Sequence, residues 1–211
     1  MSNPFDIVDS EVSNYIKHDF QNGGWKVGDE QIDANYFQVD TATIKMGWGK
    51  YDAASGYTYV FQEDLHKPIP KPDEDFKKAF AVWMYPKFIS DTQNFDLGRA
   101  VLWQRQSFGE YDGFRKMCSM FYEQAQLTEN LDKLPIVKYT GSETLKIGMG
   151  STRIPEFEFV GFKDRAEGFV LPSFALEDGN SSDPTLTESS SSASAEPSAS
   201  EGGIIDDEIP F

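Results

Sequence analysis

Negative charge and apolar groups meet in the last six residues of the chain, where three carboxylates precede an isoleucine, a proline and a phenylalanine. Such a peptide suits an apolar pocket with a basic rim. The ring and the isoleucine fill the pocket, the partner's Arg or Lys pairs with the carboxylates, and the proline restricts the backbone. A merely solubilising tail would gain nothing from ending in three apolar residues. We therefore predict a docking tip whose contacts are Asp206, Asp207, Glu208, Ile209, Pro210 and Phe211.

Aromatic and basic side chains form a second candidate set, in the body of the chain. Binding of a nucleic acid strand without sequence preference needs a basic groove and exposed rings, because every base offers a face for stacking. Trp48 lies between two glycines in a segment that predicts a turn, where burial of a tryptophan is unfavourable. Tyr57, Tyr59 and Phe61 share one face of a predicted strand, although such rows more often belong to the core. The predicted nucleic-acid contacts are Trp48, Lys50, Tyr57, Tyr59, Trp103, Arg105, Lys138, Lys146 and Arg153.

The charge of the chain is unevenly distributed. It holds 35 acidic and 19 Lys or Arg residues, a net charge of −16. Residues 177–211 contain nine of the acids and no Lys or Arg, so the body carries the remaining −7. This charge repels phosphate on average. Residues 133–154, however, hold four basic side chains against Glu143 alone, which favours a local basic surface on this segment.

No residue pattern predicts catalysis, a cofactor or a metal site. The glycine-rich segment 148–153 lacks the Lys-Ser/Thr pair of a phosphate loop and a following helix, so we expect a flexible hairpin loop there. Residues 73–75 are carboxylates in a proline-rich segment, where solvent-facing charge is expected. Cys118 is the single cysteine and the chain has two histidines, which excludes an internal disulfide and argues against a zinc cluster. With no signal peptide or membrane span apparent, we expect a cytoplasmic protein.

The elements that position these residues predict a mainly β body. Alternating residues predict a strand over 36–46, and a glycine-rich turn over 46–56 leads to the next strand. A stripe at spacings of three and four predicts one helix over 110–127, and a closing hairpin follows. This order predicts an OB-fold-like barrel. The further expected strands are 57–62, 79–85, 99–108, 134–142 and 155–164, and the expected loops include 66–75 and 143–154.

Composition divides the chain into three parts. Residues 1–176 form the predicted OB-like domain. Residues 177–203 are rich in Ser, Ala, Glu, Pro and Gly and cannot bury enough apolar surface to offset the entropy of ordering, so we expect a disordered linker. Residues 204–211 form the docking tip.

The tip resembles the acidic C-terminus of bacterial single-stranded-DNA-binding proteins, which typically ends in three aspartates and Ile-Pro-Phe. This chain departs from that ending at Glu208, a residue of like charge. The resemblance implies a body that binds single-stranded DNA and a tip that docks a helicase, nuclease, primase, polymerase or recombinase. Residues 134–165 also resemble phage-encoded replication or recombination proteins, which would place the protein in the host cytoplasm.

Two other functions stay open. The chain could be an adaptor or inhibitor that binds host DNA-processing enzymes through the tip without binding DNA. It could also be a virion structural protein in which the tip is coincidental. We favour a single-stranded-DNA-binding protein of replication, recombination or repair that is not an enzyme. Homo-oligomers, binding-site size and preference for DNA over RNA stay open.

Overall fold

The computed structural model describes residues 14–90, 94–148 and 150–172. The predicted linker and docking tip lie outside the described residues. Within the described part, no helix has both the length and the apolar character that a membrane crossing requires. The elements in chain order are β1 (Tyr15–His18), β2 (Trp25–Val27), β3 (Glu30–Ile32), β4 (Tyr36–Val39), the 3-10 turn η1 (Thr41–Thr43), β5 (Lys45–Asp52), β6 (Gly56–Phe61), β7 (Lys77–Ile89), β8 (Asn94–Asp96), β9 (Val101–Arg105), α1 (Phe108–Ala125), the 3-10 turn η2 (Thr128–Asn130), β10 (Lys133–Ile147) and β11 (Gly150–Asp164).

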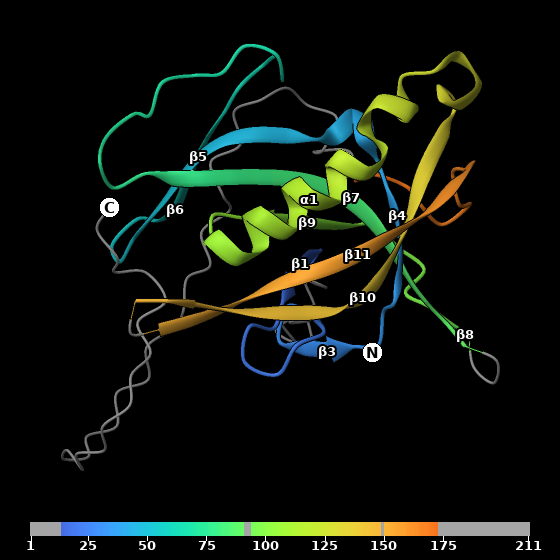
Figure 1. The fold of residues 1–211 in the computed structure, drawn as a ribbon, viewed down its shortest axis with the longest axis horizontal. Coiled ribbons are helices and arrows are strands. Elements are labelled where there is room, and N and C mark those ends of the chain that lie inside the picture. The colour runs from blue at the N-terminus through green and yellow to red at the C-terminus, as the bar shows by residue number, and fades with distance from the viewer. Residues whose placement is uncertain (1–13, 91–93, 149, 173–211) are drawn as a thin grey trace, which may run out of the picture.

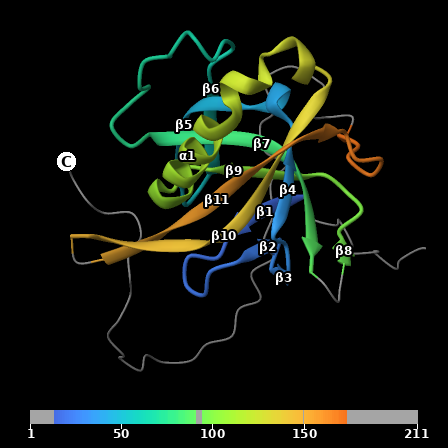
Figure 2. The same ribbon diagram turned by 45° about the vertical axis from the view of Figure 1, so that its right-hand side comes forward.

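The strands form one mixed sheet centred on β7 (Figures 1 and 2). The main path runs β11-β10-β4-β7-β9-β1-β2-β3, while β5 and β8 also pair with β7 and β6 pairs with β5. Strand β1 is parallel to β9, and the other pairs are antiparallel. Among the described strands no pairing joins β11 to β3, so the sheet is open. A mainly β fold with one helix before a closing hairpin is confirmed, whereas the OB barrel is not.

The strand predicted over 36–46 is in fact two strands, which pair with successive parts of the same edge of β7. Between them the chain turns through η1, where the Asp40 carboxylate accepts a hydrogen bond from Ala42 N at 3.2 Å. The Asp40 carbonyl accepts another from Thr43 Oγ1 at 2.8 Å. Such local side-chain bonds compete with strand pairing. An alternating sequence pattern does not reveal this competition, so the prediction of one strand was wrong.

Two predicted loops are also wrong. Residues 45–52 form β5, so the connection to β6 is confined to residues 53–55. Residues 143–154 are mostly strand as well, because β10 and β11 are each 15 residues long and pair along almost their whole length. Glycines suggested long loops in both places, but Gly47, Gly49 and Gly150 lie within paired strands, and Gly148, with a φ of 57°, is in the short turn between β10 and β11. The strands expected near 57–62, 79–85 and 99–108 are confirmed as β6, β7 and β9.

Helix α1 covers one face of the sheet and crosses it between β7 and β11 (Figures 1 and 2). Its apolar stripe of Phe114, Met117 and Phe121 is buried, which confirms the helix predicted over 110–127. The Phe114 ring stacks on Phe80 of β7 with centroids 4.1 Å apart. Full burial of one such side chain contributes about 1.5–3 kcal/mol to folding. The helix is therefore part of the core and leaves the opposite face of the sheet to other segments.

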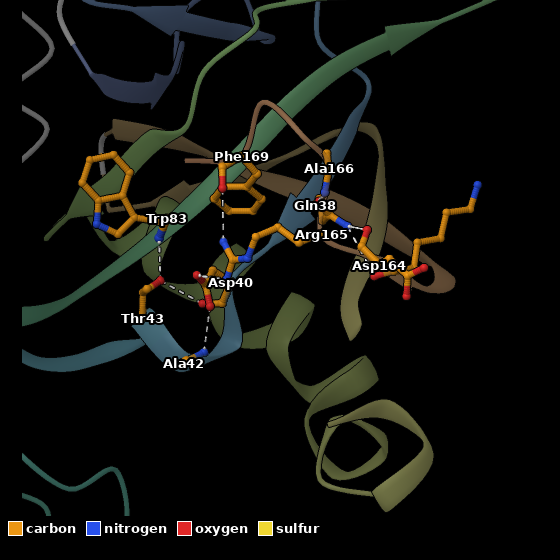
Figure 3. A network of polar contacts seen from close by, with 10 residues as sticks. Gln38, Asp40, Ala42, Thr43, Trp83, Asp164, Arg165, Ala166 and Phe169 are labelled. Carbon is orange, nitrogen blue, oxygen red and sulfur yellow. Dashed lines mark hydrogen bonds and ion pairs between the residues drawn. The ribbon is translucent and has the colours of Figure 1, made fainter. Parts of the chain in front are cut away.

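Residues 165–172 pack on the second face of β7. Phe169 is buried against Tyr85, with ring centroids 5.7 Å apart. Arg165 Nη2 forms an ion pair of 2.7 Å with Oδ2 of the buried Asp40, as Figure 3 shows. The side chain of Gln38 joins the same network, because it donates to the Asp164 carbonyl and accepts from the Ala166 amide at 2.8 Å each. These contacts attach the end of the body to the sheet just before the predicted tail.

Candidate nucleic-acid interface

Four rings lie in a row on one face of the β5–β6 hairpin. We call this row, formed by Tyr51, Tyr57, Tyr59 and Phe61, the aromatic ladder. Its successive ring centroids are 4.9, 6.0 and 5.6 Å apart, and the last two ring pairs are within 11° of parallel. Tyr51 and Tyr57 keep 59% and 41% of their surface exposed. The outer half of the ladder therefore offers rings on which bases can stack.

Strand register brings the four rings together. Tyr51 lies opposite Tyr57, and Gly49 lies opposite Tyr59, so these side chains point to the same face of the hairpin. A Cβ atom on Gly49 would lie 2.8 Å from two carbons of the Tyr59 ring and 2.7 Å from Gln106 Oε1. The glycine thus leaves the space in which the Tyr59 ring lies over the β5 backbone. The sequence predicted the shared face of the β6 rings but not the role of this glycine.

The opposite face of the hairpin is engaged by the segment that precedes β7. Trp48 is half-buried, and its indole Nε1 donates to the Ile69 carbonyl at 3.0 Å. Lys50 Nζ forms an ion pair of 3.2 Å with Asp73 and lies 4.8 Å above the Phe76 ring. The prediction that Trp48 lies at a turn tip is corrected, because it lies in a paired strand. Both residues fix the connecting segment to the hairpin.

Trp103 is fully buried, with 0% of its surface exposed. Its ring packs against Trp25, Phe80 and Phe114, and its Nε1 donates to Glu110 Oε2 at 2.7 Å. A ring without exposed surface cannot stack on a base. The prediction of Trp103 as a nucleic-acid contact is therefore wrong for this structure. The sequence of β9 gave no signal of this burial, because Val101, Leu102 and Trp103 are successive apolar residues without alternation.

Arg105 is the last residue of β9. Its Nε donates to Glu110 Oε1 at 2.8 Å, and 29% of its side chain is exposed. Burial opposes the charged guanidinium, but the Glu110 carboxylate and, more weakly, the phenol groups of Tyr57 and Tyr59 raise the pKa of Arg105. Arg105 lies opposite Phe80, on the face of β7 that α1 covers. Gly49 lies opposite both Tyr59 and Lys77, so the ladder is on the other face. The structure therefore brings Tyr57 and Tyr59 together but not Arg105.

The predicted basic residues of the β10–β11 hairpin are in a different setting. Lys138 lies opposite Glu158 in the register and 5.9 Å above the Tyr36 ring. Arg153 is half-buried and donates to Ser142 Oγ at 3.3 Å. Lys146 is exposed near the far end of the hairpin. Over residues 133–164, five basic side chains stand beside four acidic ones. The local basic surface expected here is thus nearly neutralised.

Two further observations concern Cys118 and possible metal ligands. Burial raises the pKa of the Cys118 thiol to about 12, so this thiol is protonated at neutral pH and is not a nucleophile. Among the described residues, no three His, Cys, Asp or Glu side chains come together in a way that could hold a metal ion. The six residues of the predicted docking tip lie outside the described part.

Sequence reasoning missed Glu110, which links three elements. Its carboxylate accepts hydrogen bonds from the backbone of His18 in β1, from side chains of β9 and from Ser107 before α1. Its place near the start of a predicted helix gave no signal, because acidic residues are common there.

No family model, curated protein or solved structure matches this chain.

Proposed function

We propose that this protein binds single-stranded nucleic acid on the aromatic ladder. The observation that carries the proposal is the row of four rings, of which two are well exposed. Base stacking on an aromatic side chain contributes about 1–3 kcal/mol per base. Binding on a strand face is also the mode of OB folds, and we propose that mode here without a closed barrel.

The ladder favours a single strand over a duplex. Ring stacking requires access to the face of a base, and in a duplex each base face is covered by its neighbours. The charges support the same conclusion. Lys50 is paired with Asp73, and two of the five cations of the long hairpin lie opposite an acid in the register. We expect binding that depends mainly on stacking and has a shallow salt dependence.

The test is fluorescence anisotropy of a labelled oligo-dT with the full chain and two variants, Tyr51→Ala and Tyr57→Ala. Each should weaken binding about fivefold or more. Phe20→Ala is the matched control, because Phe20 is 40% exposed but lies outside the ladder. Quenching of tryptophan is a poor readout, since Trp25, Trp83 and Trp103 are buried. Wild-type affinity in both ladder variants, or no binding by the wild-type chain, would refute the proposal.

We also propose that the tip recruits DNA-processing proteins of replication, recombination or repair, in the cytoplasm of the host if the chain is phage-encoded. Its charges, its apolar ending and its resemblance to the bacterial tip support this role. Phe211→Ala should abolish capture of a partner helicase or nuclease and leave oligo-dT affinity unchanged. Capture by the wild-type chain without any oligo-dT binding would instead favour an adaptor that does not bind DNA.

A further inference from the structure

Strand β6 forms an outer edge of the sheet. Among the described strands it pairs with β5 alone, over Gly56–Phe61. Both of its faces are accessible, because Tyr57 and Val60, which point to opposite faces, keep 41% and 39% of their surface exposed. An accessible edge of this kind is a template for pairing with a further strand.

The backbone groups that point outward from this edge belong to ladder residues. Gln62 N donates to the Met46 carbonyl at 2.9 Å, next to the pair of Gly47 and Phe61. In an antiparallel ladder this bond means that Gly47 and Phe61 exchange no hydrogen bonds with each other, and the alternation gives Tyr57, four residues earlier, the same status. The N–H and C=O groups of Phe61 and Tyr57 therefore point away from β5.

The composition of β6 differs from that of the other outer strands. Its sequence, GYTYVF, has no charged residue and no proline, and it is rich in the aromatic and β-branched residues that favour strands. The other outer strands that the structure describes, β3, β8 and β11, all contain charged residues, and β11 also contains Pro155. Charges and prolines on an edge prevent its pairing with other chains. The edge of β6 lacks this protection.

A second copy of this chain is the partner that the edge fits. Two copies of an uncharged strand can pair about a two-fold axis without placing like charges opposite each other. For antiparallel strands that axis is perpendicular to the sheet, so both ladders lie on the same side of the joined sheet. We propose that β6 pairs antiparallel with β6 of a second copy and joins the two ladders into one row of rings. An interface built on one short edge is small, so the dimer is weak.

The joined ladders allow two copies to share one nucleic-acid strand, a consequence that rests on the proposed function. Proteins that bind single strands without sequence preference usually bind cooperatively along the strand. Pairing at β6 supplies this cooperativity, because two copies on one strand have a high effective concentration at each other's edge. Long oligo-dT should therefore promote dimerisation at lower protein concentrations.

Thr58 is the residue on which the pairing can be tested. It is exposed near the middle of β6, and its side chain points to the face opposite the ladder. Thr58→Lys and Thr58→Glu each bring like charges close together across the two-fold axis, so each should weaken dimerisation about tenfold. An equimolar mixture of the two variants brings opposite charges together and should restore the wild-type dimer.

Sedimentation velocity of the full chain over a series of concentrations, with and without long oligo-dT, measures these effects. Thr128→Lys and Thr128→Glu are the matched controls, because they place the same charges on an exposed threonine outside the sheet. Both should dimerise as the wild type does. Recovery in the mixture also shows that both Thr58 variants are folded. If either is not folded, Val60→Lys and Val60→Glu form a second pair on the same face of β6.

Three results overturn the proposal. These are a wild-type chain that stays monomeric at every concentration with and without oligo-dT, Thr58 variants that dimerise as the wild type does, and a mixture that does not recover. The proposed function is judged separately. A dimer that binds no oligo-dT leaves the pairing of β6 in place and refutes the function, whereas a monomer whose oligo-dT binding is weakened by Tyr57→Ala does the reverse.

Discussion

The two long hairpins of the sheet carry most of the residues predicted to contact nucleic acid, yet they use them differently. The β5–β6 hairpin gathers its rings on one face, with Tyr51 opposite Tyr57. The β10–β11 hairpin places two of its five basic residues opposite acids, since Lys133 faces Asp164 and Lys138 faces Glu158. Strand register therefore concentrates stacking surface on one hairpin and places acids opposite two of the cations on the other. The proposed interface is therefore based on ring exposure rather than on the local count of charges.

The largest expected effect is that of adding one methyl group beneath the ladder. In Gly49→Ala the new Cβ meets the Tyr59 ring and Gln106 Oε1 at under 3 Å, so the ring must move. Overpacking of this kind costs about 1–3 kcal/mol of stability. Displacement of one ring should also weaken oligo-dT binding about tenfold. Anisotropy measures the second effect and urea unfolding the first.

The other hairpin supplies the control for this variant. A Cβ on Gly150 of β11 would have no neighbour closer than 3.7 Å, and this glycine does not have a positive φ. Gly150→Ala should therefore leave both stability and oligo-dT affinity near the wild-type values. Equal loss of affinity in the two glycine variants would remove the distinction between the hairpins.

The comparison of the two hairpins also shows which parts of this structure the sequence could predict. Periodicity located the helix and the shared face of Tyr57, Tyr59 and Phe61, because these depend on local geometry alone. It could not show that Trp103 is buried, since burial depends on the packing of α1 and β7 against β9. It also could not show that Glu158 lies opposite Lys138, since that depends on pairing between distant residues. Glycines were misread as turn signals because Gly49 serves a contact across strands.

A smaller effect is expected from charge reversal on the β10–β11 hairpin. Lys146→Glu changes an exposed side chain near the end of that hairpin, away from the paired acids nearer its base. If the ladder is the interface, this variant should weaken oligo-dT binding by less than about threefold, through long-range repulsion that salt screens. Anisotropy at low and high salt measures it. A loss as large as that of Tyr57→Ala would move the interface to the basic hairpin.

The smallest expected effect concerns pH and the attachment of the long hairpin to the body. His18 of β1 is buried, its Nε2 lies 3.0 Å from the Tyr139 hydroxyl of β10, and no hydrogen bond to its Nδ1 is made by the described residues. Desolvation lowers the pKa of His18 below its ordinary value of 6.5, and the Arg153 charge contributes, although the carboxylates of Glu110 and Asp19 oppose the shift.

The sign of the pH effect follows from this shift. The unfolded chain binds a proton at His18 more readily than the folded chain does, so stability is fully present above pH 6.5 and decreases as the pH falls below it. We expect the midpoint of thermal unfolding to decrease from about pH 7.5 to about pH 5, and to decrease less in His18→Gln. His66→Gln, which changes an exposed histidine, is the control and should keep the wild-type profile. An identical pH profile in His18→Gln would show that other groups cause the decrease. Oligo-dT affinity of the folded protein should stay constant over this range, because His18 binds the long hairpin and not the ladder.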